Sequence, residues 1–284
     1  MLKLLEQQVE LLLKVVLPLS RSDGDTRAER FCVLPIAGCE TVVSICDLAR
    51  KARLGDCLML SRSVVEWAAN YCFLLVSDEA DAVAFEQHAK QRQFRNLDRS
   101  IKAGPMTAAL TFAPLPDPDA VPDLKEALDA FTSERGREIT RWTKLHLHDR
   151  IRVFSERSTL DALPLLSLAF WCYDDASEIL HGTLYGSWAS QGAHLPFQTA
   201  VEQIADGRNA TLFFMAVVLM NVLNLIVQAT AESVDLEPWG VADLPEFSAF
   251  KNDGIVSDLH DYMKAKGQKP SWPSVTFARN DRAV

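Results

Sequence analysis

The sequence has little glycine and proline for its length, with 12 and 13 of these residues among 284. It also lacks a regular alternation of apolar and polar residues between turn signals, which argues against an all-β fold. Apolar residues make up 48% of the chain and charged residues 24%, so a disordered or fibrous chain is excluded as well. The composition therefore favours a globular, helical fold.

An excess of basic residues is also absent, because 29 Lys and Arg stand against 38 Asp and Glu, a net charge of −9. No overall positive field is available to hold a nucleic-acid backbone, so such contact needs a local basic patch. The best candidate is the predicted helix 79–103. Its second half carries Lys90, Arg92, Arg95, Arg99 and Lys102 around Phe94. This patch indicates a phosphate or RNA contact, or alternatively an ordinary solvated face.

Motifs for metals, nucleotides and secretion are missing too. There is no Cys-x-x-Cys pair and no glycine-rich phosphate loop, so neither zinc nor any other cofactor is predicted. His146, His148 and Asp149 lie close in sequence, but residues two apart on a helix point away from each other. No secretory signal precedes the six cysteines, most of which lie in apolar stretches like buried hydrophobes, so the cytoplasm is the predicted compartment.

The helical periodicity predicts one bundle over 1–232, built from about seven or eight mainly antiparallel helices. A proline-rich excursion at 104–122 interrupts it, and a less ordered tail follows at 233–284. The uncharged stretch 210–231 is long enough to span a bilayer. It carries polar residues at 221, 224 and 228 on one face, which favours a central buried helix over a membrane span.

Three strongly apolar helices each carry one stripe of polar residues. The stripes are Arg62, Glu66 and Asn70 in 58–76; Asp174, Glu178, His181 and Tyr185 in 165–187; and Asn221, Asn224 and Gln228 in 210–231. Since buried ionised groups must be paired, we expect the stripes to converge in one internal cluster. In that cluster Arg62 contacts Glu178 or Asp174 as well as Glu66 on its own helix, and His181 completes the set.

Two of these segments resemble the bacterial proteins grouped as the domain of unknown function 5677 family. DCLMLSRSVVEWAANYCFLL is similar to its Arg-Ser-x-x-Glu helix, and YDDASEILHGTLYGS to its Tyr-x-x-x-Ser-Glu-x-x-His-Gly segment. RWTKLHLHDRI is similar to a Trp-containing stretch between them, so the resemblance covers roughly 30–232. It implies an all-helical bundle with these residues on the matching positions: Arg62, Ser63, Glu66, Tyr173, Ser177, Glu178, His181 and Gly182.

A weaker resemblance is to the helical HEPN ribonucleases, in which a histidine acts as general acid or base and an arginine stabilises the phosphorane. This sequence departs from their pattern, because no single helix carries the Arg followed by a polar residue and then a His. By this resemblance Arg62 would stabilise charge, His181 would transfer the proton, and Glu66 and Glu178 would orient them.

The polar neighbours of these four residues complete the predicted site as binding residues. They are Asn70, Asp174, Ser177, Tyr185, Asn221 and Asn224. Two functions remain open at this point. One is a defence or toxin-like effector that cleaves phosphodiester bonds without a metal. The other is a helical scaffold or ligand sensor whose polar cluster only specifies packing. RNA, a nucleotide or a second copy of the chain are the candidate partners, and no membrane is favoured.

Overall fold

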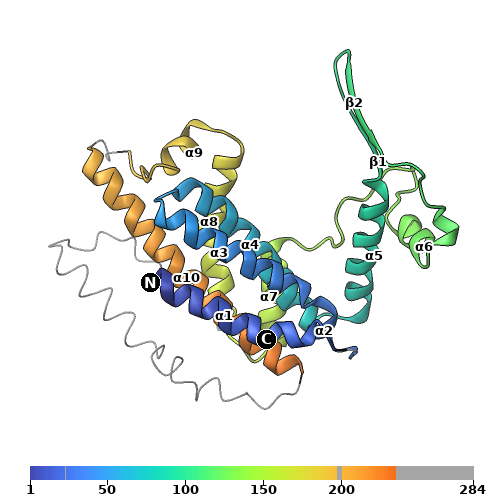
Figure 1. Cartoon of the computed structure of the whole chain (residues 1–284), viewed down its shortest axis with the longest axis horizontal. Coiled ribbons are helices and arrows are strands. Elements are labelled where there is room, and N and C mark those ends of the chain that lie inside the picture. The colour runs from blue at the N-terminus through green and yellow to red at the C-terminus, as the bar shows by residue number, and fades with distance from the viewer. Residues whose placement is uncertain (23, 197–199, 235–284) are drawn as a thin grey trace, which may run out of the picture. The chain divides into compact units, whose positions relative to one another are not determined.

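The computed structural model describes residues 1–22, 24–196 and 200–234, which form an all-helical bundle as the sequence predicts (Figure 1). The chain divides into two units, Met1–Asp235 and Leu236–Val284, and the described residues all belong to the first. All but the first two residues of the predicted tail therefore lie outside the described residues. The helices are α1 (Leu2–Leu19), α2 (Arg27–Phe31), α3 (Val33–Arg50), α4 (Leu54–Val76), α5 (Glu79–Arg95), α6 (Leu124–Ala130), α7 (Leu147–Arg157), α8 (Leu163–Leu180), α9 (Leu184–Ala189) and α10 (Val201–Ser233).

Helix α4 occupies the centre of the bundle. It packs against α3, α7, α8 and α10 and buries residues on most of its circumference, from Leu54 to Leu74. A Cβ placed on Gly38 of α3 would lie 1.8 Å from the indole ring of Trp67, so a glycine is required where α3 and α4 approach. The strongly apolar composition of α4 thus matches its position.

Helix α10 is the one described helix that is long and apolar enough to cross a membrane by length and composition. It packs along α1, α8 and α4, and 61% of its most apolar window is buried in the bundle. The Tyr71 hydroxyl of α4 and the Thr230 hydroxyl of α10 form a buried 2.9 Å hydrogen bond. Helix α10 is thus packed on the bundle along its apolar side, whereas Asn221 and Gln228 of its polar face are exposed.

The structure differs from the predicted helices between residues 96 and 146. Helix α5 ends at Arg95, and the chain forms an antiparallel hairpin of β1 (Asp98–Ala103) and β2 (Met106–Thr111). Gly104, with φ of +59°, begins the two-residue loop Gly104–Pro105, a position that favours glycine in a type II′ turn. After the hairpin come a 3₁₀ turn (Pro118–Ala120) and the short α6, which begins at Leu124. An irregular segment then leads to α7.

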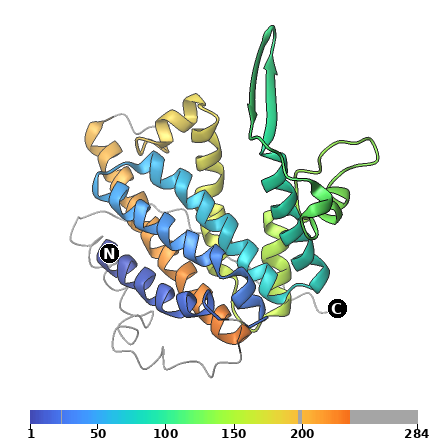
Figure 2. The ribbon, with the colours of Figure 1, turned by 45° about the vertical axis from the view of Figure 1, so that its right-hand side comes forward.

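The hairpin extends away from the helices beyond the end of α5, as both ribbon views show (Figures 1 and 2). Every residue of its two strands is exposed. The proline-rich excursion predicted at 104–122 therefore begins with a strand that the helical reading of the sequence missed.

All six cysteines are free and buried, and burial raises their thiol pKa values. The pKa rises to about 11 for Cys46 and to about 12 for Cys39, Cys57 and Cys172. They behave as the small buried hydrophobes that the sequence predicts.

We therefore expect the native chain to resist thiol reagents. Because the thiolate is the reacting species, a disulfide reagent at pH 8 should label the native thiols at least about 100-fold more slowly than those of the unfolded chain. The measurement is the absorbance of the released thiolate with and without denaturant. Rapid release of even one equivalent from the native chain would contradict the buried placement.

Candidate functional site

The polar stripe on α4 is present as predicted, but its partners are not those expected. Arg62, Glu66 and Asn70 meet Arg150 of α7 and Tyr173 of α8. We call these five residues the α4 cluster. The cluster is therefore supplied by α4 and by two helices, α7 and α8, that follow much later in the chain.

Arg150 is the most buried member, with 7% of its surface exposed. Its Nη2 lies 3.0 Å from Oε2 of Glu66, and its Nη1 donates to Oδ1 of Asn70. Its Nε is buried and has no hydrogen-bond partner among the described residues. The Arg150 guanidinium is thus held by α4 on one side, and Glu66 offsets its charge.

Arg62 and Tyr173 form the more open side of the cluster. The Tyr173 hydroxyl donates to Oε1 of Glu66 at 3.1 Å and accepts from Nη2 of Arg62 at 3.3 Å. The Arg62 guanidinium also lies over the Tyr173 ring, 4.4 Å from its centre, which is a cation–π contact. Both side chains are half-buried.

The charges of the α4 cluster do not balance. The cluster holds two arginines and one carboxylate: Glu66 pairs with Arg150, and Arg62 forms no ion pair within the described part of the chain. Desolvating an uncompensated cation costs free energy, which an anion entering from solvent would offset. Chemically, the arrangement suits the binding of an anion beside Arg62.

The predicted convergence with Glu178, Asp174 and His181 is wrong. Asp174 is exposed, and the Glu178 carboxylate accepts a 2.7 Å hydrogen bond from the Thr183 hydroxyl. His181 is the exposed C-cap of α8, about 12 Å along the helix from Tyr173 at 1.5 Å per residue. The reason is angular: the face that α8 turns toward Arg62 and Glu66 carries Tyr173, so its neighbour Asp174 points about 100° away.

Tyr185, the last member of the predicted stripe, belongs to α9, because α8 ends at Leu180. The Tyr185 hydroxyl donates to Asp175 at 2.8 Å, and Nδ1 of His194 lies 3.5 Å from the same carboxylate. Burial lowers the pKa of His194, although Asp175 opposes this shift. Ser177 is half-buried, and its carbonyl accepts the backbone N–H of His181. None of these contacts reaches the α4 cluster.

The α10 stripe stays apart as well. Asn221 is exposed and donates to the carbonyl of Val217 on its own helix, and Gln228 is exposed. Asn224 is half-buried, with its Oδ1 unpartnered among the described residues. The expectation that the three stripes meet is thus wrong, because the α4 stripe finds its partners in Arg150 of α7 and Tyr173 of α8, which belong to none of the predicted stripes.

The predicted basic face of α5 is largely paired. Lys90 lies 2.9 Å from Asp123 and Arg92 lies 2.7 Å from Glu138, while Arg95 donates to Thr132 at 2.6 Å. The remaining cations, Arg99 and Lys102, belong to the hairpin and are exposed. A continuous basic helix for RNA is therefore not formed.

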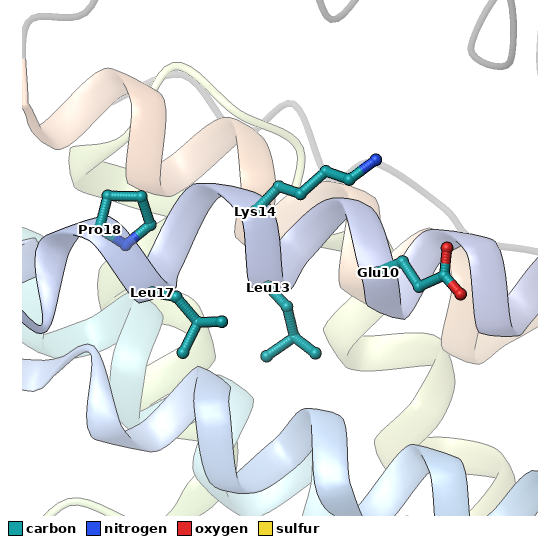
Figure 3. Close-up of a pocket in the computed structure, with 5 residues that line it drawn as sticks. All are labelled: Glu10, Leu13, Lys14, Leu17 and Pro18. Atoms are coloured by element: carbon teal, nitrogen blue, oxygen red, sulfur yellow. The ribbon is translucent and has the colours of Figure 1, made fainter.

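Two further features lie apart from the α4 cluster. His146 caps the start of α7 and its backbone N–H donates to Asp149, and no group of three metal-ligating side chains occurs in the described residues. A groove runs along α1 (Figure 3) and is lined by Glu10, Leu13, Lys14, Leu17 and Pro18. None of these side chains belongs to the helices that carry the α4 cluster.

Sequence reasoning missed Arg150 as a site residue, although a signal for it exists. The buried apolar residues of α7 are Leu147, Ile151 and Phe154. Arg150 follows Leu147 by three positions and precedes Phe154 by four, so it lies on the same buried face. An arginine on an apolar face requires an acceptor on the helix opposite, and Glu66 is that acceptor.

Fold and site together define an all-helical protein with a half-buried cationic cluster between its central helices. The chain belongs to the family of unknown function DUF5677, whose sequence profile matches residues 31–199 and includes all five residues of the α4 cluster. No curated protein and no solved structure matches the chain. The likeness to HEPN ribonucleases is not supported by these comparisons.

The ion pair between Glu66 and Arg150 should contribute measurably to stability. Glu66→Leu leaves Arg150 buried without its carboxylate and should lower the free energy of unfolding by roughly 2 kcal/mol. Adding Arg150→Met should recover most of this loss, because an apolar pair replaces the ionic one. Urea unfolding measures both changes.

A suitable control is Glu156→Gln, which removes an exposed ion pair with Arg152 and should change the free energy of unfolding by less than about 0.5 kcal/mol. If Glu66→Leu is as stable as this control, the pair does not hold α4 to α7.

Proposed function

We propose that this protein binds a phosphate-bearing ligand, an RNA or a nucleotide, at the α4 cluster. The observation that carries the proposal is the Arg62 guanidinium, which lies over Tyr173 and has no carboxylate partner among the described residues. Glu66, the nearest acid in the cluster, is already engaged by Arg150 and Tyr173.

The geometry of arginine explains why a phosphate suits this position. A guanidinium stacked on an aromatic ring keeps the N–H groups along its edge free, and these form paired hydrogen bonds to phosphate oxygens. Of its five N–H donors, Arg62 uses one toward the described residues, in the 3.3 Å bond to Tyr173. Binding therefore adds hydrogen bonds without breaking an existing ion pair.

Phosphodiester cleavage, and with it a role in bacterial defence or as a toxin, stays a further proposal based on sequence. Cleavage needs a proton-transferring group beside the phosphate. The Tyr173 hydroxyl touches Arg62, whereas His181 lies at the exposed end of α8. We also propose a reducing, cytoplasmic location, supported by six unpaired cysteine thiols.

Binding is tested by fluorescence anisotropy with a labelled single-stranded RNA oligonucleotide and by competition with a free nucleotide. Arg62→Gln should weaken binding of both at least about tenfold, because a charge-assisted contact to phosphate is lost. The matched control is Arg152→Gln on the exposed side of α7, which should bind like the unaltered protein. Equal affinity of the two variants would reject Arg62 as the contact.

Cleavage is tested separately on the same oligonucleotide. Where the unaltered protein cuts RNA, Tyr173→Phe should reduce the rate by about 100-fold if the hydroxyl transfers the proton. His181→Ala should then retain activity, because His181 is outside the cluster. If His181→Ala instead reduces the rate and Tyr173→Phe does not, His181 belongs to the site. If the unaltered protein cuts no RNA, the proposal of cleavage is rejected and the alternative is a ligand sensor or scaffold.

A further inference from the structure

The β1–β2 hairpin is an exposed element that the proposed function does not use. Its residues alternate between two faces, and one face carries the large apolar side chains Ile101, Met106 and Leu110. These are 71%, 70% and 43% exposed. An isolated two-stranded hairpin is marginally stable in water, and three or more strands with an apolar face are needed for stability.

The two edges of the hairpin differ in a way that bears on what covers it. Strand β1 carries three charged residues, Asp98, Arg99 and Lys102, which discourage further strand pairing. Strand β2 (Met106–Thr111) contains no charge and no proline. One edge is therefore protected and the other is open.

We propose that the open β2 edge pairs with the β2 edge of a second copy of this chain, giving a four-stranded antiparallel sheet across a two-fold axis. A single open edge on each copy closes the assembly at two, because the charged β1 strands then lie outermost. Four strands also reach the number that an apolar-faced sheet needs for stability. A second copy is the favoured partner because the apolar pattern of β2 is self-complementary, with Met106 and Leu110 at equal distances on either side of Ala108.

The pattern of the strand also sets a register. Residues opposite each other in antiparallel strands share a face, so Ala108 lies opposite the partner's Ala108 and Met106 opposite the partner's Leu110. This register keeps the apolar residues of both hairpins on one side of the sheet. The small alanine at the axis lets the two backbones approach without a clash.

The first test is the oligomeric state of the full chain by sedimentation at about 100 µM. This concentration is high because one strand from each copy forms only a small interface, and small interfaces bind weakly. We expect a dimer. Ala108→Lys puts two like charges opposite each other and should raise the dissociation constant at least about tenfold. Ser100→Lys places the same charge on β1, outside the pairing edge, and should dimerise as the unaltered chain does.

A second test is Ala108→Cys under mild oxidation. Opposite Cα atoms in an antiparallel pair lie about 4.5–5.5 Å apart, within the range of a disulfide. Since the six native cysteines are buried, this variant should form a covalent dimer, and Ser100→Cys should not. A monomeric chain at about 100 µM, or an Ala108→Lys variant that dimerises unchanged, would overturn the proposal whatever the RNA binding result.

Discussion

The ion pair between Glu66 and Arg150 is the contact on which the arrangement of the central helices depends. Helix α4 is apolar over most of its surface and is surrounded by other helices, so its polar stripe has to find partners inside the protein. Arg150 satisfies Glu66 and Asn70 and thereby sets how α7 lies along α4. Tyr173 ties α8 to the same carboxylate. One acid thus joins three helices.

The same acid explains why Arg62 differs from Arg150. Glu66 offsets one positive charge, and the more buried Arg150 engages it directly. Arg62 keeps its charge at the more open side and is positioned by the Tyr173 ring rather than by a carboxylate. A structural pair and a candidate ligand contact therefore coexist in one cluster. This makes separate tests of stability and binding informative, because Glu66 bears on the first and Arg62 on the second.

The hairpin is structurally separate from the bundle, since it makes few contacts with the helices beyond its connection to α5. Its strands are exposed on both faces, and charge protects only one of its edges. The proposed ligand contact at the α4 cluster and the proposed pairing edge of β2 therefore lie on separate elements of the structure.

The amino-acid sequence by itself determined the helical class, the buried cysteines and the stripe on α4, because helical periodicity and apolar composition act locally. Successive residues on a helix point about 100° apart. A stripe on one helix therefore does not specify which residue of a neighbouring helix meets it. Only the tertiary structure decided that α8 offers Tyr173 rather than Asp174, and that α7 supplies Arg150. The hairpin was also missed, since Lys and Arg at 90–102 fit a helix as well as a strand until Gly104–Pro105 turns the chain. The positions of Arg150 and Tyr173 at the cluster depend on contacts between residues far apart in the chain, which local patterns do not encode.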